Sequence, residues 1–266
     1  MTPAERASAV AFTYKNCELS QLRPGRPMVA ATNHYQRGDH GVERLLEAAE
    51  SGASQHAGQD RGASTATSGT ANAGTANATN AAADRSTLLA DRVFARSVRA
   101  VEMGWLEDGG LGELRSIHRR IFVGARPGAG ELRRHDRPET PYFPATLIET
   151  GAANIVASLA ERRRGITANR TTFIRALARL ADELTTLRPF DYGNDMVLRI
   201  FVSRFAHTNG WDLDWGPVRR DDYLRAKAMT LDADTGGFLR LFDAIARPAN
   251  LTRVFLIAGW DQGPAH

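Results

Sequence analysis

The chain has 266 residues, long enough for one sizeable domain, or for a domain of ordinary size with an added low-complexity segment. Its single cysteine, Cys17, excludes an intramolecular disulfide and a structural zinc site built on several cysteines. The formal net charge is +4, from 34 Lys and Arg against 30 Asp and Glu. This modest excess favours a mixed-charge surface over a dedicated nucleic-acid interface.

The sequence contains neither a secretory signal nor a membrane-spanning apolar run. The first residues contain no basic region followed by a long apolar run, as a secretory signal requires. No uncharged apolar run approaches the roughly 20 residues that cross a bilayer. The arginine cluster at 162–164 is not interleaved with aromatic residues. We therefore expect a soluble, cytoplasmic protein with neither a membrane nor a nucleic acid as its partner.

Residues 1–50 form an N-terminal segment of unknown role. They offer one short helix, over residues 41–50, and a turn-rich stretch that contains Pro24 and Pro27. Three interpretations stay open for this segment: an arm that binds a partner, a strand-like extension packed on the main domain, or an inert leader.

Residues 51–85 are predicted to be a low-complexity, disordered linker. They include the near-repeats Gly69-Thr-Ala-Asn-Ala and Gly74-Thr-Ala-Asn-Ala, and scarcely any large apolar side chain. Ordering a residue costs on the order of 1 kcal/mol or more, and a segment that buries nothing cannot offset that cost.

Residues 86–250 are predicted to form an all-α, mainly helical domain, followed by a C-terminal tail over residues 251–266. The clearest helix has an apolar stripe with helical spacing, formed by Leu114, Ile117, His118, Ile121 and Phe122. The apolar stretch over residues 197–206 predicts a helix buried on most sides. Further helices are expected near residues 155–163, 173–187, 221–229 and 238–245. We expect a short β-hairpin in the extended segment that begins at Pro141.

Chemistry is expected in the segment over residues 187–199, where a glycine-containing loop leads into the amino end of the buried helix. This segment resembles the loop of Fic proteins, His-Pro-Phe-x-acid-Gly-Asn-Gly-Arg-x-x-Arg. It aligns with that loop without a gap and retains Pro189, Phe190, Gly193, Asn194 and Arg199.

Other segments support the resemblance, in the same order and spacing. The helix over residues 114–122 is similar to the family pattern Leu-x-x-Ile-His-x-x-Ile-Phe, and residues 129–133 stand at the place of its Trp-Ala-Gly-x-x-Arg turn. The segment over residues 210–215 resembles the family's C-terminal half. The resemblance covers roughly residues 86–248 and implies a Fic-type helical bundle with a short β-hairpin flap over residues 141–148.

The resemblance also implies an activity. Fic proteins usually transfer AMP from ATP to a protein hydroxyl, so ATP and Mg²⁺ are the implied cofactors and an unknown target protein is the implied partner. A histidine of the loop is the general base, and an acidic residue holds the metal. Carried over by position, Gly193, Asn194 and Arg199 would bind the nucleotide, and the flap would dock the target.

The loop departs from the family where the chemistry occurs. Arg188 stands at the histidine position, and a guanidinium with a pKa above about 12 cannot accept a proton near neutrality. Tyr192 replaces the acidic residue, and a neutral phenol is a poor ligand for Mg²⁺. Asp195 replaces a glycine, and Met196 replaces the first arginine. Gly128 stands where the family turn has tryptophan. We therefore predict that catalysis is impaired or absent and that the loop holds no metal.

The alternative is an active nucleotidyl or phosphoryl transferase with a shifted site, in which Asp191 approaches a metal and Arg188 contacts phosphate. His118 and His207 are candidate bases, but a histidine on an apolar helix face is more often a hydrogen-bonded core residue. The family's inhibitory helix signature, Ser or Thr followed four residues later by Glu and then Gly or Asn, is absent from the sequence. An active chain would then need a separate antitoxin-like inhibitor, whereas a degenerate one would need none.

Overall fold

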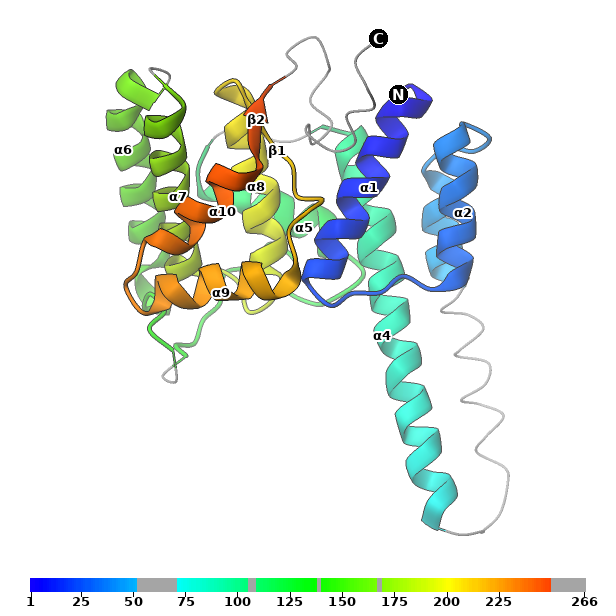
Figure 1. Ribbon diagram of the computed structural model, residues 1–266. Coiled ribbons are helices and arrows are strands. Elements are labelled where there is room, and N and C mark those ends of the chain that lie inside the picture. The colour runs from blue at the N-terminus through cyan, green and yellow to red at the C-terminus, as the bar shows by residue number, and fades with distance from the viewer. Residues whose placement is uncertain (52–70, 105–108, 138–139, 167–168, 250–266) are drawn as a thin grey trace.

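The computed structural model describes residues 1–51, 71–104, 109–137, 140–166 and 169–249, and this part of the chain is mostly helical (Figure 1). This confirms the predicted fold class, whereas the predicted tail over residues 251–266 lies outside the described residues. A helical stretch over residues 43–51 confirms the short helix predicted there. The other helices are α1 (Pro3–Leu19), α2 (Arg26–Arg37), α4 (Ala71–Glu102), α5 (Leu111–Phe122), α6 (Ile148–Ile166), α7 (Arg170–Leu187), α8 (Asn194–Thr208), α9 (Arg220–Leu231) and α10 (Gly236–Ile245).

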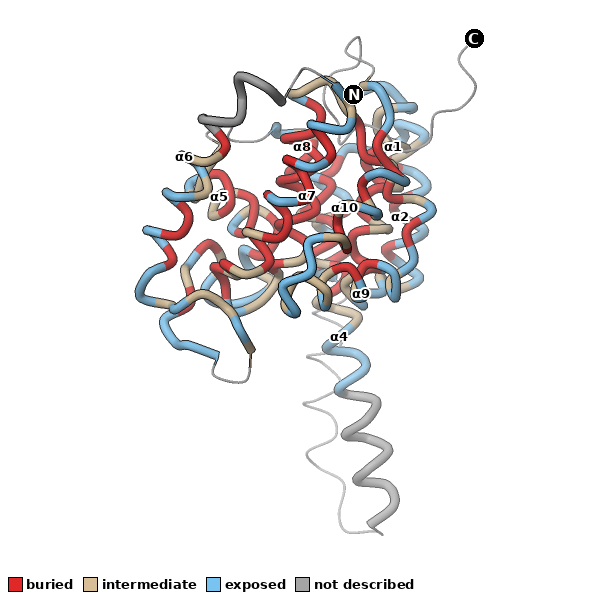
Figure 2. Tube along the Cα trace, turned by 60° about the vertical axis from the view of Figure 1, so that its left-hand side comes forward, coloured by how far each residue is buried: buried red, intermediate tan, exposed pale blue. Residues whose placement is uncertain are grey.

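Helix α8 lies at the centre of the fold. It contacts α1, α5 and α7, and its residues from 196 to 207 are all buried, as the predicted central helix requires. Figure 2 shows the buried positions gathered where α7, α8 and α10 pack together. The loop leads directly into the amino end of α8. Its position is therefore fixed by the helices that pack against α8.

A two-stranded antiparallel sheet fixes the segment after α8. Strand β1 (Trp211–Leu213) pairs with β2 (Ala246–Pro248), with Trp211 opposite Pro248. The sheet joins the end of α8 to the end of α10, so the C-terminal helices are fastened to the central helix.

The expected hairpin over residues 141–148 is absent, so this part of the flap prediction was wrong. Residues 140–147 form turns and a short 3₁₀ helix, Ala145–Leu147. Pro141 and Pro144 have no N–H group to donate to a strand ladder. The Phe143 N–H instead donates to the Thr186 carbonyl at the end of α7, at 2.9 Å. The flap is therefore docked on a helix end.

The N-terminal segment is part of the fold, so the inert-leader interpretation was wrong. Helix α1 begins with a capping box, in which the side chains of Thr2 and Glu5 each accept a hydrogen bond from the other's backbone N–H. It contacts α4, α8 and α9, and Figure 1 shows α1 and α2 beside α4. Sequence patterning missed both helices.

Residues 71–85, predicted as the end of the linker, form the first turns of α4 instead. Alanine recurs through this stretch and is the best helix former, so a segment without large side chains can continue a helix that is anchored further along. In Figure 1 this part of α4 extends away from the other helices. Residues 52–70 lie outside the described residues.

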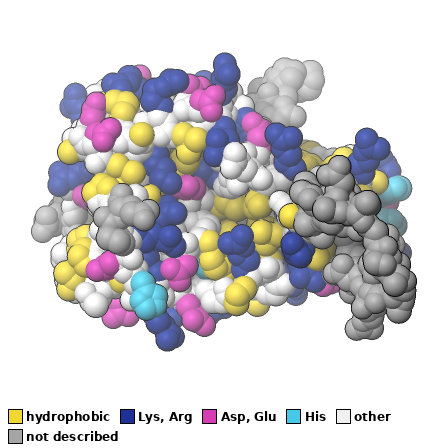
Figure 3. Space-filling model, turned by 90° about the horizontal axis from the view of Figure 1, so that it is seen from below, with side chains coloured by type: hydrophobic (Ala, Val, Ile, Leu, Met, Phe, Trp, Pro, Cys, Tyr) yellow, Lys and Arg dark blue, Asp and Glu magenta, His cyan; other side chains and the backbone are white. Residues whose placement is uncertain are grey.

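The surface carries both signs of charge. On the face seen in Figure 3, Lys and Arg side chains are interspersed with Asp and Glu and do not form a basic stripe. The side chains of the cluster at 162–164 lie outside the described residues. Among the helices described, none combines the length and the hydropathy needed to cross a membrane.

Candidate functional site

The loop between α7 and α8 is closed by Asn194. Its Oδ1 accepts a hydrogen bond from the Phe190 N–H at 2.9 Å, and its Nδ2 donates to the Phe190 carbonyl at 2.7 Å. The Phe190 ring is fully buried. Asn194 was predicted to bind nucleotide. In the structure its side-chain amide forms hydrogen bonds that close the loop.

Gly193 is required at the start of α8. It has a φ of +71°, a left-handed conformation that favours glycine, and an added Cβ would lie 2.2 Å from the Phe122 ring. This close approach couples the loop to α5.

Arg188, at the family's histidine position, ends α7 in a left-handed conformation with a φ of +40°. Its guanidinium lies over the ring of Tyr142, 4.8 Å from the centroid. This cation–π contact joins the loop to the flap.

Tyr192, at the family's acidic position, is fixed by a hydrogen bond from its hydroxyl and by a contact of its ring. Its hydroxyl donates to the Pro127 carbonyl at 2.6 Å, and its ring meets Phe122 edge-on. Burial raises the pKa of this phenol, and the cation of Arg126 only partly opposes the rise. Tyr192 therefore stays neutral and serves as a hydrogen-bond donor.

Asp195 lies in the first turn of α8, and both of its carboxylate oxygens accept hydrogen bonds from Lys227 of α9, at 2.9 and 3.0 Å. Burial acts to raise the pKa of Asp195, but Lys227 and Arg199 outweigh it, so the pKa is lowered. The amino end of α8 therefore already carries an ionised carboxylate with its own cation.

Arg199, the second arginine of the loop pattern, is 1% exposed and is bound by the N-terminal helix. Its Nε donates to Asn16 Oδ1 at 2.6 Å, and its Nη2 donates to the Asn16 carbonyl and to the Ser20 hydroxyl. The guanidinium also lies 4.7 Å from the centroid of the Tyr223 ring. Sequence reasoning missed Asn16 and Ser20, although the Thr-x-x-Glu capping box near residue 2 could have revealed the helix that carries them.

Arg133 is a second buried guanidinium that sequence reasoning left without a role. It is 2% exposed and donates to the carbonyls of Arg188, His135 and Phe143. It thus ties the loop and the flap to one side chain through charge-assisted hydrogen bonds.

Asp191, the predicted substitute metal ligand, is exposed and faces Arg137, with 3.6 Å between Oδ1 and Nη2. Within the described ranges, no cluster of three or more His, Cys, Asp or Glu residues could hold a metal ion.

Both histidines considered as substitute bases are hydrogen-bonded core residues, as the sequence favoured. His207 Nδ1 lies 2.7 Å from Asp212 Oδ1. His118 Nδ1 accepts from the Gly130 N–H at 2.7 Å, and its Nε2 lies 3.1 Å from the Tyr192 carbonyl, to which it donates as the neutral tautomer. His118 therefore supports the turn and the loop.

The environment of His118 predicts a pH-dependent stability. Burial lowers the pKa of His118 from 6.5 to about 4. The unfolded chain binds this proton more readily between those values, so stability should fall as the pH drops from about 6.5 to 4, by ~3 kcal/mol in all. Urea unfolding of the native chain and of His118→Gln across this range measures the effect as a shrinking difference between them. An NMR titration of the His118 ring with a midpoint near 6.5 would contradict it.

Comparison with known proteins identifies the fold. Residues 108–206, from just before α5 to near the end of α8, match the model of the Fic/DOC family. The chain is 26% identical over 151 residues to "Probable protein adenylyltransferase Fic" of Escherichia coli K12, covering 56% of this chain and 75% of that protein. It is 31% identical over 136 residues to "Protein adenylyltransferase VbhT" of Bartonella schoenbuchensis, covering 48% of this chain and only 28% of that protein.

A solved structure supports the same fold. The BepC protein of Bartonella tribocorum, a VirB-translocated effector crystallised with bound AMPPNP, superposes with a TM-score of 0.54 at 17% identity, over 60% of this chain and 85% of that one. The segment that the family model matches contains α5, the loop and most of α8. Residues 108–206 of the chain therefore carry a Fic/DOC family domain.

Proposed function

We propose that this chain is an adenylyltransferase-like Fic protein that no longer transfers AMP, and that its loop instead serves as a structural junction of a protein-binding scaffold. The observation that carries the proposal is the ion pair between Asp195 and Lys227 at the amino end of α8. The helix amino end and the loop are where the family binds phosphate.

The charge at this helix end opposes a nucleotide. Exposed N–H groups and the helix dipole make an amino end attractive to anions. The Asp195 carboxylate lies in the first turn of α8, where the helix dipole already stabilises its negative charge. It would repel a phosphate brought to the same place. Met196 stands where the family has an arginine, and it is buried and uncharged. A phosphate would therefore meet a repulsive charge and lack an attractive one.

Arg199, which is implied to bind nucleotide, has partners within the chain. Its Nε and Nη2 donate to Asn16 and Ser20, and the side chain is 1% exposed. If the guanidinium moved out of the core toward a phosphate, the buried Asn16 amide would lose its charged partner. This cost falls on any nucleotide that binds the loop.

The loop also lacks the general base and the acidic metal ligand that the family's reaction uses. A guanidinium stands at the position of the general base, and the Tyr192 hydroxyl donates a hydrogen bond to the Pro127 carbonyl. We infer that the residues of this loop do not fit Mg²⁺ and ATP. In this proposal the chain needs no antitoxin-like inhibitor, and its partner is a protein bound without modification.

The alternative, an active transferase with a shifted site, depends on Asp191. Its exposure is the observation in favour, since the carboxylate could meet a cation at the surface. Its pairing with Arg137 counts against it. In this alternative Asp191→Ala should abolish turnover.

The experiment compares the native chain with a variant in which the loop is restored by Arg188→His, Tyr192→Glu, Asp195→Gly and Met196→Arg. A second form of that variant adds Asn16→Ala and Ser20→Ala, which frees Arg199 from its side-chain acceptors. Calorimetry measures ATP binding with and without Mg²⁺, and α-phosphate-labelled ATP reports self-modification. We expect binding only in the restored variants, and tighter binding in the form that frees Arg199.

Two outcomes contradict the proposal. Mg²⁺-dependent labelling by the native chain that disappears in Arg199→Ala would establish an active enzyme. Failure of both folded restored variants to bind ATP would show that the replaced residues are not what prevents binding. Circular dichroism of every variant provides the control for folding.

A further inference from the structure

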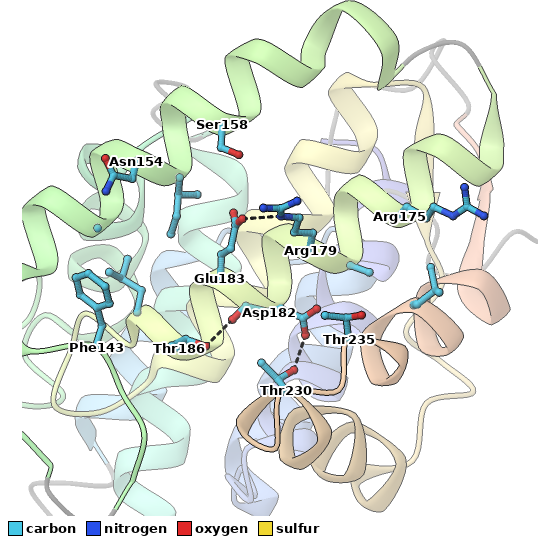
Figure 4. A pocket seen from close by; sticks show the side chains of 16 residues that line it. Phe143, Asn154, Ser158, Arg175, Arg179, Asp182, Glu183, Thr186, Thr230 and Thr235 are labelled. Atoms are coloured by element: carbon cyan, nitrogen blue, oxygen red, sulfur yellow. Dashed lines mark hydrogen bonds and ion pairs between the residues drawn. The ribbon is translucent and has the colours of Figure 1, made fainter.

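A large cavity lies outside the loop, between α6, α7 and the segment that joins α9 to α10 (Figure 4). Its volume is about 930 Å³, and none of the loop residues 188–199 is among the described residues that line it. Its apolar walls include Phe143, Ile155, Leu187 and Leu239. Clefts of roughly 300–1,000 Å³ with apolar walls and a few polar groups are typical of small-molecule sites, so the size suits a small ligand.

One carboxylate in the wall of this cavity is incompletely paired. Asp182 of α7 is 8% exposed, and its Oδ1 accepts a hydrogen bond from the Thr230 hydroxyl of α9. Its Oδ2 accepts no hydrogen bond from the described residues. A buried acceptor without a donor costs roughly 1–3 kcal/mol, and more when it is charged, so a ligand that supplies a donor gains free energy at this point.

Among the described residues that line the cavity, no Lys or Arg side chain is ion-paired with Asp182. Burial raises the pKa of Asp182 to about 6, and the carboxylates of Glu183 and Asp234 add to the rise. Arg179 is paired with Glu183 at 3.0 Å, and Figure 4 shows Arg175 directed away from Asp182. The Asp182 carboxylate is still mostly ionised above pH 7, and it lies among other acidic groups.

We propose that this cavity binds a small organic amine, with its ammonium group at Asp182 Oδ2 and its apolar body against Phe143, Ile155 and Leu239. Asp182 is part of the cavity wall and its Oδ2 is buried, so binding requires the carboxyl to turn toward the ligand. An ammonium donor satisfies the unpaired oxygen and offsets the local negative charge. This site is separate from the loop and does not depend on whether the chain transfers AMP.

The test uses three ligands of one shape, 4-phenylbutylamine, 4-phenylbutanol and 4-phenylbutyrate, titrated into the full chain by calorimetry at pH 7.5. We expect the amine to bind at least about tenfold more tightly than the alcohol, as a charge-assisted hydrogen bond requires, and the carboxylate to be rejected. The amine should bind less tightly as the pH falls through 6, because protonation removes the charge on Asp182.

Matched variants separate the carboxylate from the cavity. Asp182→Asn should weaken amine binding about tenfold or more and leave alcohol binding nearly unchanged. Glu183→Gln, the same change of charge one residue along, should weaken amine binding less than Asp182→Asn does, because Glu183 is already paired with Arg179. Asn154→Trp, at an exposed position on the rim, should reduce binding of both ligands by filling space. Equal affinity for amine and alcohol, no amine binding, or an unchanged affinity in folded Asp182→Asn would overturn the proposal.

Discussion

Replacing Glu113 with alanine is expected to destabilise the chain by about 3–5 kcal/mol, because it removes the carboxylate that is ion-paired with the buried Arg204. Glu113 of α5 accepts a hydrogen bond from Arg204 Nε of α8 at 2.7 Å. The two side chains are 6% and 4% exposed. Its other carboxylate oxygen accepts from the Gly109 N–H, just before α5. Urea unfolding followed by circular dichroism measures the loss.

The control for Glu113→Ala is Glu47→Ala, which removes an ion pair that is exposed on both sides. The Arg44 and Glu47 side chains are 65% and 58% exposed, and such pairs contribute about 0–1 kcal/mol. A double variant, Glu113→Leu with Arg204→Met, should recover much of the stability, since an apolar pair of similar volume needs no charge compensation. If Glu113→Ala costs no more than Glu47→Ala, the buried pair does not hold α5 to α8.

The sequence was sufficient for the central part of the fold because that part repeats simple patterns. The stripe through Ile117 and Ile121 has helical spacing, and both residues are fully buried. The apolar stretch after Asn194 becomes α8. The loop was recognisable because Gly193 and Asn194 have local roles, a left-handed turn and a loop-closing amide. Residues whose roles depend on neighbours in sequence were therefore predicted well.

The failures involve contacts between distant segments. Helix α1 presents Asn16 and Ser20 to α8, so its buried face is partly polar and its periodicity is weak. Lys227, the partner of Asp195, lies 32 residues along the chain. The flap became a docked turn because a carbonyl at the end of α7 accepts the Phe143 N–H. These outcomes depend on tertiary packing, which overrides local pattern.

Substituting Gly193 with alanine should destabilise the chain by about 2–5 kcal/mol, the second large effect that the loop predicts. A left-handed φ of +71° costs a non-glycine residue about 1–2 kcal/mol. The new Cβ would also meet the Phe122 ring at 2.2 Å, and relieving such an overlap in a packed core typically costs a further 1–3 kcal/mol. Because Phe122 also packs against Tyr192 and His118, the disturbance should reach the whole loop.

Gly210→Ala separates the two contributions to this loss. Gly210 has a φ of +85°, but no atom lies within 4 Å of the position its Cβ would take, so its substitution should carry the backbone cost alone. Gly193→Ala combined with Phe122→Leu should then unfold at a urea concentration closer to that of the Phe122→Leu single variant, because the smaller side chain leaves room for the methyl group. Equal losses in Gly193→Ala and Gly210→Ala would mean that Phe122 moves aside freely, and that contact between α5 and the loop is not what makes glycine necessary at the start of α8.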